Sequence, residues 1–252
     1  MQFGEVVIDE ALLWVLFSLL VVFVILMVAL WIGRKPESPE RIITMTVSDL
    51  IKASFRQASE RHFALHEAWI RISYRIGGLL PKSALLLSVQ RYGELDLVLR
   101  CMEEELAPKL RNNPGLDSHY QYQLLFSEIW VGGIYEILRL LNERKLALDN
   151  DEYRALFRDF ELLRITIEKH DNANQGKLTA PLQMTTYDQT KVYTFTKDDP
   201  QRSHIMPMVI TAKGSVVWQA IDVRANTDRW IERRSLSDRM IALWEVQPAQ
   251  PA

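Results

Sequence analysis

The sequence HYQYQLLFSEIWVGGIYEILRLLNERKL, residues 119–146, predicts a long helix at the centre of a helical bundle. Apolar residues recur on most sides of such a helix, namely Tyr120, Leu124, Leu125, Ile129, Trp130, Ile134, Ile137, Leu138 and Leu141. A helix that is apolar nearly all round is usually surrounded by other helices. Because Glu128, Glu136 and Arg139 interrupt the run, we do not expect it to enter a membrane. The pair Gly132-Gly133 indicates close approach by a neighbouring helix.

Helices are also predicted on both sides of this central segment. Residues 82–110 have a helical pattern and end at a strong turn, Asn112-Asn113-Pro114-Gly115. Residues 151–169 carry an apolar stripe at helical spacing, formed by Tyr153, Leu156, Phe157, Phe160, Leu163 and Ile167. The preceding pair Asp149-Asn150 offers an N-cap for this helix.

Residues 46–76 predict one continuous helix of about thirty residues. Two rows of mainly apolar side chains repeat every seven residues, Ile51, Ala58, Leu65 and Ile72 in one and Phe55, His62, Trp69 and Ile76 in the other. The flanking positions lack the paired opposite charges of a coiled coil, so packing inside a domain is favoured over a free stalk. Gly77-Gly78 and Pro81 then end the helix.

The pattern changes from helical to extended after residue 176. Residues 191–197, 207–212 and 215–223 are rich in β-branched and aromatic side chains and predict a three-stranded meander. Lys213-Gly214 forms the turn between the second and third strands, since glycine accepts positive φ. Residues 226–245 predict a C-terminal helix, which a capping box at Ser235 and Asp238 could divide in two.

These elements predict an α-rich (α+β) protein with a helical bundle, a small antiparallel meander and a C-terminal helix. The expected parts are an N-terminal tail and anchor (1–34), a linker (35–45), a helical domain (46–176) and the meander with its helix (177–252). We see no internal repeat.

Residues Ala11–Ile32 (ALLWVLFSLLVVFVILMVALWI) contain no charged side chain and predict a single transmembrane helix. A helix of this length spans about 33 Å, and the hydrocarbon core of a bilayer about 30 Å. Trp14 and Trp31 suit the membrane boundaries, and Arg34 and Lys35 mark the cytoplasmic flank. We therefore expect a single-pass protein of the inner or plasma membrane, with its N-terminus outside and its C-terminal domain in the cytoplasm. The acidic start and long apolar run argue against a cleaved signal peptide.

Charge balance excludes a dedicated DNA-binding domain. The chain has 30 basic and 32 acidic residues. Without the three basic and five acidic residues of 1–41, 27 of each sign remain, whereas duplex-binding domains usually carry a basic excess. The lone cysteine, Cys101, cannot form an intrachain disulfide. His62 and His66 have the four-residue spacing of the histidines in a zinc protease motif, but no glutamate follows His62, so we expect core or boundary histidines, no metal site and no cofactor.

Arg164 is the most informative polar residue, because it falls on the apolar stripe of the predicted 151–169 helix. A guanidinium there must be paired or reach water, and Glu128 and Glu136 are candidate partners. His170 follows to complete Arg-x5-His, which resembles the Arg-x(4–6)-His motif of the HEPN superfamily, helical domains that include metal-independent RNases and toxins. That resemblance implies a catalytic Arg164, which stabilises phosphate charge, and a catalytic His170, which assists proton transfer.

A second candidate site lies near the C-terminus. Between residues 202 and 239 there are seven basic and four acidic residues, interleaved with tryptophans. Arginine beside tryptophan suits an anionic partner such as a lipid headgroup, RNA or an acidic protein surface. The candidate binding residues are Arg224, Arg229, Arg233, Arg234, Trp230 and His204. Intramolecular pairing with neighbouring acidic residues is the alternative that we favour.

The sequence thus favours a membrane-anchored interaction, assembly or regulatory subunit without catalysis of its own. The expected partners are the bilayer, through residues 11–32, and another protein or a second copy of the chain. The alternative is a membrane-anchored HEPN-like RNase or toxin-type effector using Arg164 and His170. A third hypothesis is a lipid- or nucleotide-sensing domain that uses the C-terminal arginines.

Overall fold

The computed structural model describes residues 46–112, 120–169, 177–178, 180–197 and 206–245. The chain divides into two compact units, residues 1–51 and 52–252, with the boundary inside the first described helix. The predicted transmembrane segment 11–32, with Trp14, Trp31, Arg34 and Lys35, lies outside the described residues. Within the described ranges, no helix has the length and hydrophobicity needed to cross a bilayer.

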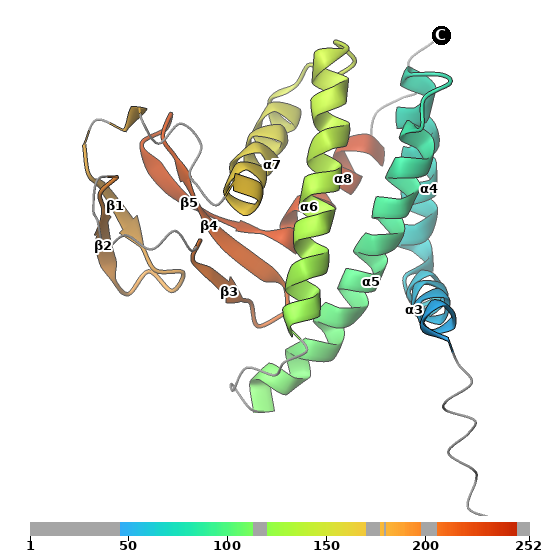
Figure 1. The fold of residues 1–252 in the computed structure, drawn as a ribbon, viewed down its shortest axis with the longest axis horizontal. Coiled ribbons are helices and arrows are strands. Elements are labelled where there is room, and N and C mark those ends of the chain that lie inside the picture. The colour runs from blue at the N-terminus through green and yellow to red at the C-terminus, as the bar shows by residue number, and fades with distance from the viewer. Residues whose placement is uncertain (1–45, 113–119, 170–176, 179, 198–205, 246–252) are drawn as a thin grey trace, which may run out of the picture. The chain divides into compact units, whose positions relative to one another are not determined.

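The protein is α+β and helix-rich, as the sequence predicts. The described helices are α3 (Val47–Arg61), α4 (Phe63–Leu79), α5 (Leu85–Asn112), α6 (Tyr120–Glu143), α7 (Asp151–Lys169) and α8 (Arg233–Glu245) (Figure 1). Helix α7 has the predicted bounds. It starts at the predicted cap, where the Asn150 Oδ1 atom accepts a hydrogen bond from the Tyr153 backbone amide at 2.7 Å.

The prediction of one continuous helix over residues 46–76 is wrong. His62, with φ −113° and ψ 42°, leaves the helical conformation and separates α3 from α4. Its side chain lies 3.5 Å from the Glu104 carboxylate of α5. The two sevenfold rows therefore do not form one buried face, because Ile51 in α3 is exposed whereas Ile72 and Ile76 in α4 are buried.

The strands form two small antiparallel sheets rather than one meander. They are β1 (Leu182–Thr185), β2 (Val192–Phe195), β3 (Met208–Ile210), β4 (Val216–Asp222) and β5 (Thr227–Glu232). β2 pairs with β1, and the three-stranded sheet has the order β3-β4-β5. The prediction missed β1 and assigned β5 to the C-terminal helix. Ser235 lies inside α8, so the capping box does not divide that helix.

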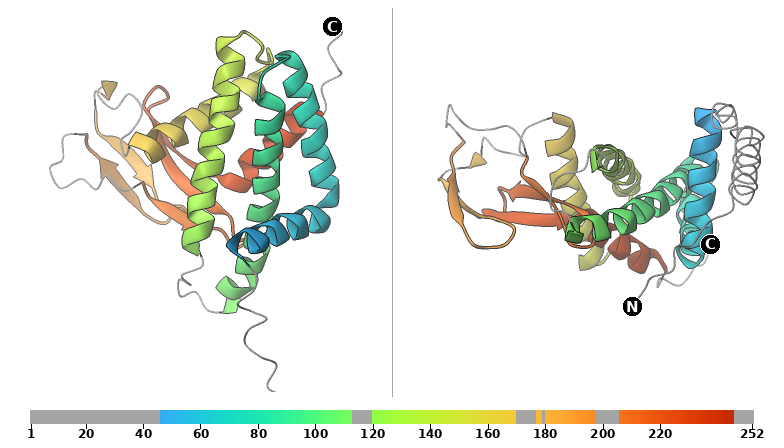
Figure 2. Two further views of the ribbon diagram at one scale, coloured as in Figure 1. Left: turned by 45° about the vertical axis from the view of Figure 1, so that its right-hand side comes forward. Right: turned by 90° about the horizontal axis from the view of Figure 1, so that it is seen from below.

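The β3–β5 sheet packs between the helices and the β1–β2 hairpin. In β4, Trp218 and Ala220 join the core formed by the helices, whereas Ile221 packs with Leu182 and Met184 of β1. Figure 2 shows the hairpin on the side of this sheet away from α6. One hydrophobic core therefore contains residues from both the predicted helical part and the predicted C-terminal part of the chain.

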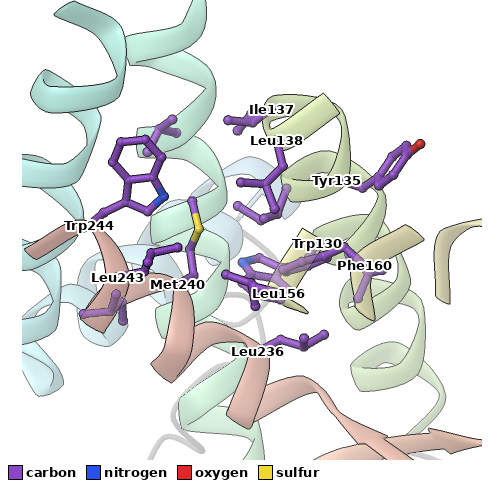
Figure 3. Packing of buried hydrophobic residues seen from close by; sticks show 14 of the residues in the cluster. Trp130, Tyr135, Ile137, Leu138, Leu156, Phe160, Leu236, Met240, Leu243 and Trp244 are labelled. Carbon is purple, nitrogen blue, oxygen red and sulfur yellow. The ribbon is translucent and has the colours of Figure 1, made fainter. Parts of the chain in front are cut away.

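Helix α6 contributes the middle of this core. Trp130, Ile134 and Leu138 on α6 have no exposed surface. In Figure 3, Trp130 lies beside Leu156 and Phe160 of α7, and Met240 lies nearby on α8. A Cβ atom at Gly133 would come within 2.0 Å of the Tyr92 ring of α5, so the predicted close approach of a neighbouring helix is confirmed.

Candidate functional site

A buried network of charged side chains joins α5 to the start of α8. Arg233 forms an ion pair with Asp96 and donates a hydrogen bond from Nε to Glu103 Oε1 at 2.8 Å. Arg100 Nε bonds to Asp96 Oδ2 at 2.8 Å, and Arg234 Nη1 bonds to Glu103 Oε2 at 2.8 Å. Arg233, Asp96 and Glu103 are almost completely buried, so each charge depends on its partners.

Aromatic residues from two other helices complete the network. Trp69 Nε1 of α4 donates a hydrogen bond to Asp96 Oδ2 at 3.0 Å. The Arg233 guanidinium lies over the Trp130 ring of α6, 5.5 Å from its centroid. A cation over an aromatic face is stabilised by the ring quadrupole. The network therefore connects four helices, and Arg233 lies at its centre.

The charges around Asp96 determine its protonation. Burial alone would raise the pKa of Asp96, but the opposing charges of Arg233 and Arg100 outweigh it and hold the pKa at about 2. The carboxylate thus stays ionised across the physiological pH range. Asp96 therefore acts as a fixed negative charge in the network.

A cleft of about 450 Å³ opens beside this network. Its lining comes from the C-terminal half of α5, the β3–β4 turn and the first turns of α8, and consists of Glu103, Glu104, Ala107, Pro108, Arg111, Lys213, Arg234 and Asp238. Lys213 lies in the β3–β4 turn next to Gly214, whose φ of +83° shapes this turn. A Cβ atom at Gly214 would lie 2.2 Å from the Glu103 carbonyl oxygen, so the turn backbone packs directly against α5.

A second arginine cluster surrounds Asp159 of α7. Arg229 Nη1 lies 2.7 Å from Asp159 Oδ1, and Arg239 Nη1 lies 2.7 Å from Oδ2. Arg239 also bonds to Glu152 through Nε at 2.6 Å. A cleft of about 300 Å³ adjoins this cluster, and Trp230 forms one part of its wall. Two carboxylates offset the two guanidinium charges there, so the cluster has no excess of positive charge.

The structure separates the candidate arginines predicted from the sequence. Arg233 and Arg234 belong to the buried network, Arg229 and Trp230 belong to the Asp159 cleft, and Arg224 is exposed at the β4–β5 turn. His204, the remaining member of the predicted set, lies outside the described residues. These residues do not form a single anion-binding surface.

Arg164 makes structural contacts on the α6–α7 side of the domain. Its Nη2 atom lies 2.8 Å from Glu168 and 3.6 Å from Glu136. Its guanidinium also lies over the Tyr135 ring, 5.3 Å from the centroid. His170 lies outside the described residues, so the geometry of the Arg-x5-His pair stays a prediction.

The histidine and cysteine side chains within the described ranges form no metal-ligand group, since no cluster of three or more His, Cys, Asp or Glu residues there could hold an ion. Burial lowers the pKa of His62, and the charge of Glu104 opposes this shift only in part. Burial also raises the pKa of the Cys101 thiol, which disfavours a reactive thiolate.

Helix α6 presents an apolar stripe on the side away from its buried face. Tyr122, Leu125 and Ile129 are 63%, 49% and 48% exposed, and their spacing of three and four places them on one face. On the same helix, Gln123 and Ser127 are buried. Polar residues thus point inward and large apolar residues outward along this turn of α6, which is the reverse of the usual arrangement.

No known protein family, curated protein or solved structure matches this chain.

Five residues of the two candidate sites could not be identified from the sequence. Asp96, Arg100 and Glu103 have a spacing of four and three, which predicts one face of a helix that otherwise buries leucines. Arg111 and Lys213 are brought to one cleft only by the tertiary fold.

Proposed function

We propose that this chain is a single-pass, membrane-anchored interaction subunit without catalysis of its own. Its cytosolic domain binds a partner protein through the α6 stripe of Tyr122, Leu125 and Ile129. The exposure of this stripe carries the proposal. Large apolar side chains that line up on one exposed helix face are typical of protein-binding surfaces.

The rigid setting of α6 supports this proposal. The opposite face of the helix is anchored by Trp130 and Ile134, and Gln123 bonds to the Gly214 carbonyl of the β3–β4 turn. Because contacts on its inner side already fix α6, the helix loses little further conformational entropy when a partner binds to its outer side. This favours binding. Tyr122 adds a side chain that is enriched at interfaces.

The membrane part of the proposal rests on the sequence of residues 11–32. It is tested by extracting membranes at alkaline pH with carbonate, where an anchored chain stays in the pellet. Release of the chain into the supernatant would contradict the proposed membrane anchor. It would not bear on the α6 surface, which the following experiment tests separately.

Photo-crosslinking tests the α6 surface. A photoreactive amino acid is placed at Leu125 in the full-length chain in its native membrane, and the same group is placed at Tyr74 on α4 as a control, since Tyr74 is also an exposed apolar position on a helix. We expect an adduct of discrete mass from position 125 and none from position 74. An adduct of twice the chain mass identifies a second copy as the partner.

Substitution sharpens the same test. Ile129→Asp should abolish the adduct from position 125, because a charge on the stripe would be buried by the partner. Leu87→Asp, at an exposed apolar position on α5, should leave the adduct unchanged. Equal crosslinking in both variants would overturn the proposed surface.

A further inference from the structure

We propose that the 450 Å³ cleft between α5, the β3–β4 turn and α8 binds a phosphate group, from either an anionic lipid headgroup or a soluble phosphate compound. This inference is independent of the α6 surface. It rests on the charges left uncompensated around the cleft and on the way the fold holds them.

Every carboxylate that lines the cleft is paired inside the protein. Glu103 is bonded by the two arginines at the start of α8. Glu104 pairs with Arg61 at 2.7 Å, and Asp238 pairs with Arg100 at 2.6 Å. An ion pair offsets the field of each carboxylate, so these groups repel an incoming anion much less than free carboxylates would.

Two of the lining cations have no carboxylate partner among the described residues. Arg111 at the end of α5 and Lys213 in the β3–β4 turn are both exposed, and neither forms an ion pair with any residue that the structure describes. Arg234 also lines the cleft; its Nη1 bonds to Glu103 and its Nε lies 4.0 Å from Asp238 Oδ1, while Nη2 makes no such contact with a described residue. Its guanidinium thus keeps donors for a further acceptor. The lining itself has three cations and three carboxylates, but the arginines that pair with these carboxylates from within the protein, Arg61, Arg100 and Arg233, are accompanied by only one further carboxylate, Asp96. Two positive charges therefore remain in excess around the cleft.

The fold holds these cations around one hollow. The turn carrying Lys213 is closed by a bond from the Gly214 amide to the Thr211 carbonyl at 2.8 Å, and its backbone rests on Glu103. Arg234 is fixed by the same glutamate from the other side. Because cations from three separate elements converge, the cleft suits a compact anion with several acceptor oxygens, which is the chemistry of phosphate.

Lipid is one source of that phosphate. The proposed anchor would keep the domain at a membrane surface, where anionic headgroups are concentrated and attract basic residues. A soluble phosphate compound is the other source, and a cleft of this volume accommodates either one.

The test uses the full-length chain in a non-ionic detergent. Two probes are titrated separately, inorganic pyrophosphate and short-chain phosphatidic acid, with phosphatidylcholine as the zwitterionic lipid control, and binding is measured by calorimetry. The variants are Arg111→Gln, Lys213→Gln and the double variant. The matched controls are Arg144→Gln, Lys191→Gln and their double variant, which remove the same charges from exposed positions elsewhere.

We expect saturable binding of phosphatidic acid, weakened about tenfold by each cleft substitution and unchanged in the matched controls. Binding of pyrophosphate as well indicates recognition of phosphate in general, whereas binding of phosphatidic acid alone assigns the site to a headgroup. Absence of saturable binding for both probes overturns the proposal. Equal binding by the cleft and control variants overturns it too, and circular dichroism of each variant verifies that the fold is retained.

Discussion

Arg233 at the start of α8 and Asp96 in the middle of α5 form an ion pair in which neither side chain has exposed surface. The two residues are 137 positions apart in the sequence. Each is also bonded to a second charged residue, Arg233 to Glu103 and Asp96 to Arg100. A buried charge is tolerated only while its partners are present, so this pair makes the helical part and the C-terminal part depend on each other.

Arg233→Met should destabilise the domain strongly. It leaves two buried carboxylates without their central cation, and breaking a buried pair in this way costs about 3–5 kcal/mol. Urea unfolding of the purified chain, followed by tryptophan fluorescence, measures the loss. Arg154→Gln is the control, because Arg154 pairs with Asp149 and Asp151 at exposed positions, where water screens ion pairs, and its loss should change the stability little. Equal stability of the two variants would show that the buried network is not needed.

Stability should fall as the pH is lowered from about 5 towards 2. Burial tends to raise the pKa of Asp96, but Arg233 and Arg100 hold it at about 2, below the ordinary 3.8. Because the pKa of Asp96 is lower in the folded chain than in the unfolded chain, the ionised carboxylate stabilises the folded state at pH values above the unfolded pKa. This contribution, about 2 kcal/mol, is lost as the pH falls through the folded pKa and Asp96 is protonated. Urea unfolding at a series of pH values checks this. In Asp96→Asn, the free energy of unfolding should depend less steeply on pH over that range. An unchanged slope would contradict the assignment of this pH dependence to Asp96.

The neighbouring glycines of α6 should respond in opposite ways to alanine. At Gly133 a Cβ would lie 2.0 Å from the Tyr92 ring, so Gly133→Ala must displace α5 and lower the free energy of unfolding by about 1–3 kcal/mol. At Gly132 the nearest atom is Glu168 Oε1 at 3.5 Å, so Gly132→Ala should be neutral or stabilise by up to about 1 kcal/mol. Thermal unfolding of both variants measures the difference. The same loss in both would mean that α5 and α6 do not approach as described.

Arg164→Gln should leave the domain folded, with a loss of less than about 1 kcal/mol. Arg164 is partly exposed and shares its charge with Glu168 and Glu136, and such pairs contribute little. Incubation of wild type and variant with single-stranded RNA tests the HEPN resemblance directly, and we expect no cleavage by either protein. Cleavage by wild type that disappears in Arg164→Gln and in His170→Ala would replace the interaction role with a catalytic one.

Local signals predicted the helices better than the strands. Helix α7 has its cap at Asn150 and a clean stripe, and both features are encoded by residues close in the chain. β5, with the sequence TDRWIE, carries charges and no regular apolar alternation, so its partner β4 rather than its own pattern makes it a strand. The break at His62 also escaped prediction, because the contact with Glu104 that accompanies it is tertiary.

The candidate site was harder to predict than the fold for a related reason. The sequence indicated that the C-terminal arginines would be anion-binding or internally paired, but it could not say which carboxylate each arginine meets. Arg233 meets Asp96 and Glu103 of α5, and Arg229 meets Asp159 of α7. Lys213 lies beside Arg234 only because the β3–β4 turn packs against α5. Such pairings depend on tertiary packing, which residue spacing does not encode.

The long separation between Asp96 and Arg233 has a consequence for biosynthesis. A ribosome completes α5 well before it reaches α8, so the nascent chain holds Asp96 and Glu103 without the Arg233 guanidinium until α8 has been made. During that interval, burial of the two carboxylates is unfavourable. The interior of the domain can therefore close only after α8 has been made, and a message truncated before codon 233 would yield a chain unable to complete its core.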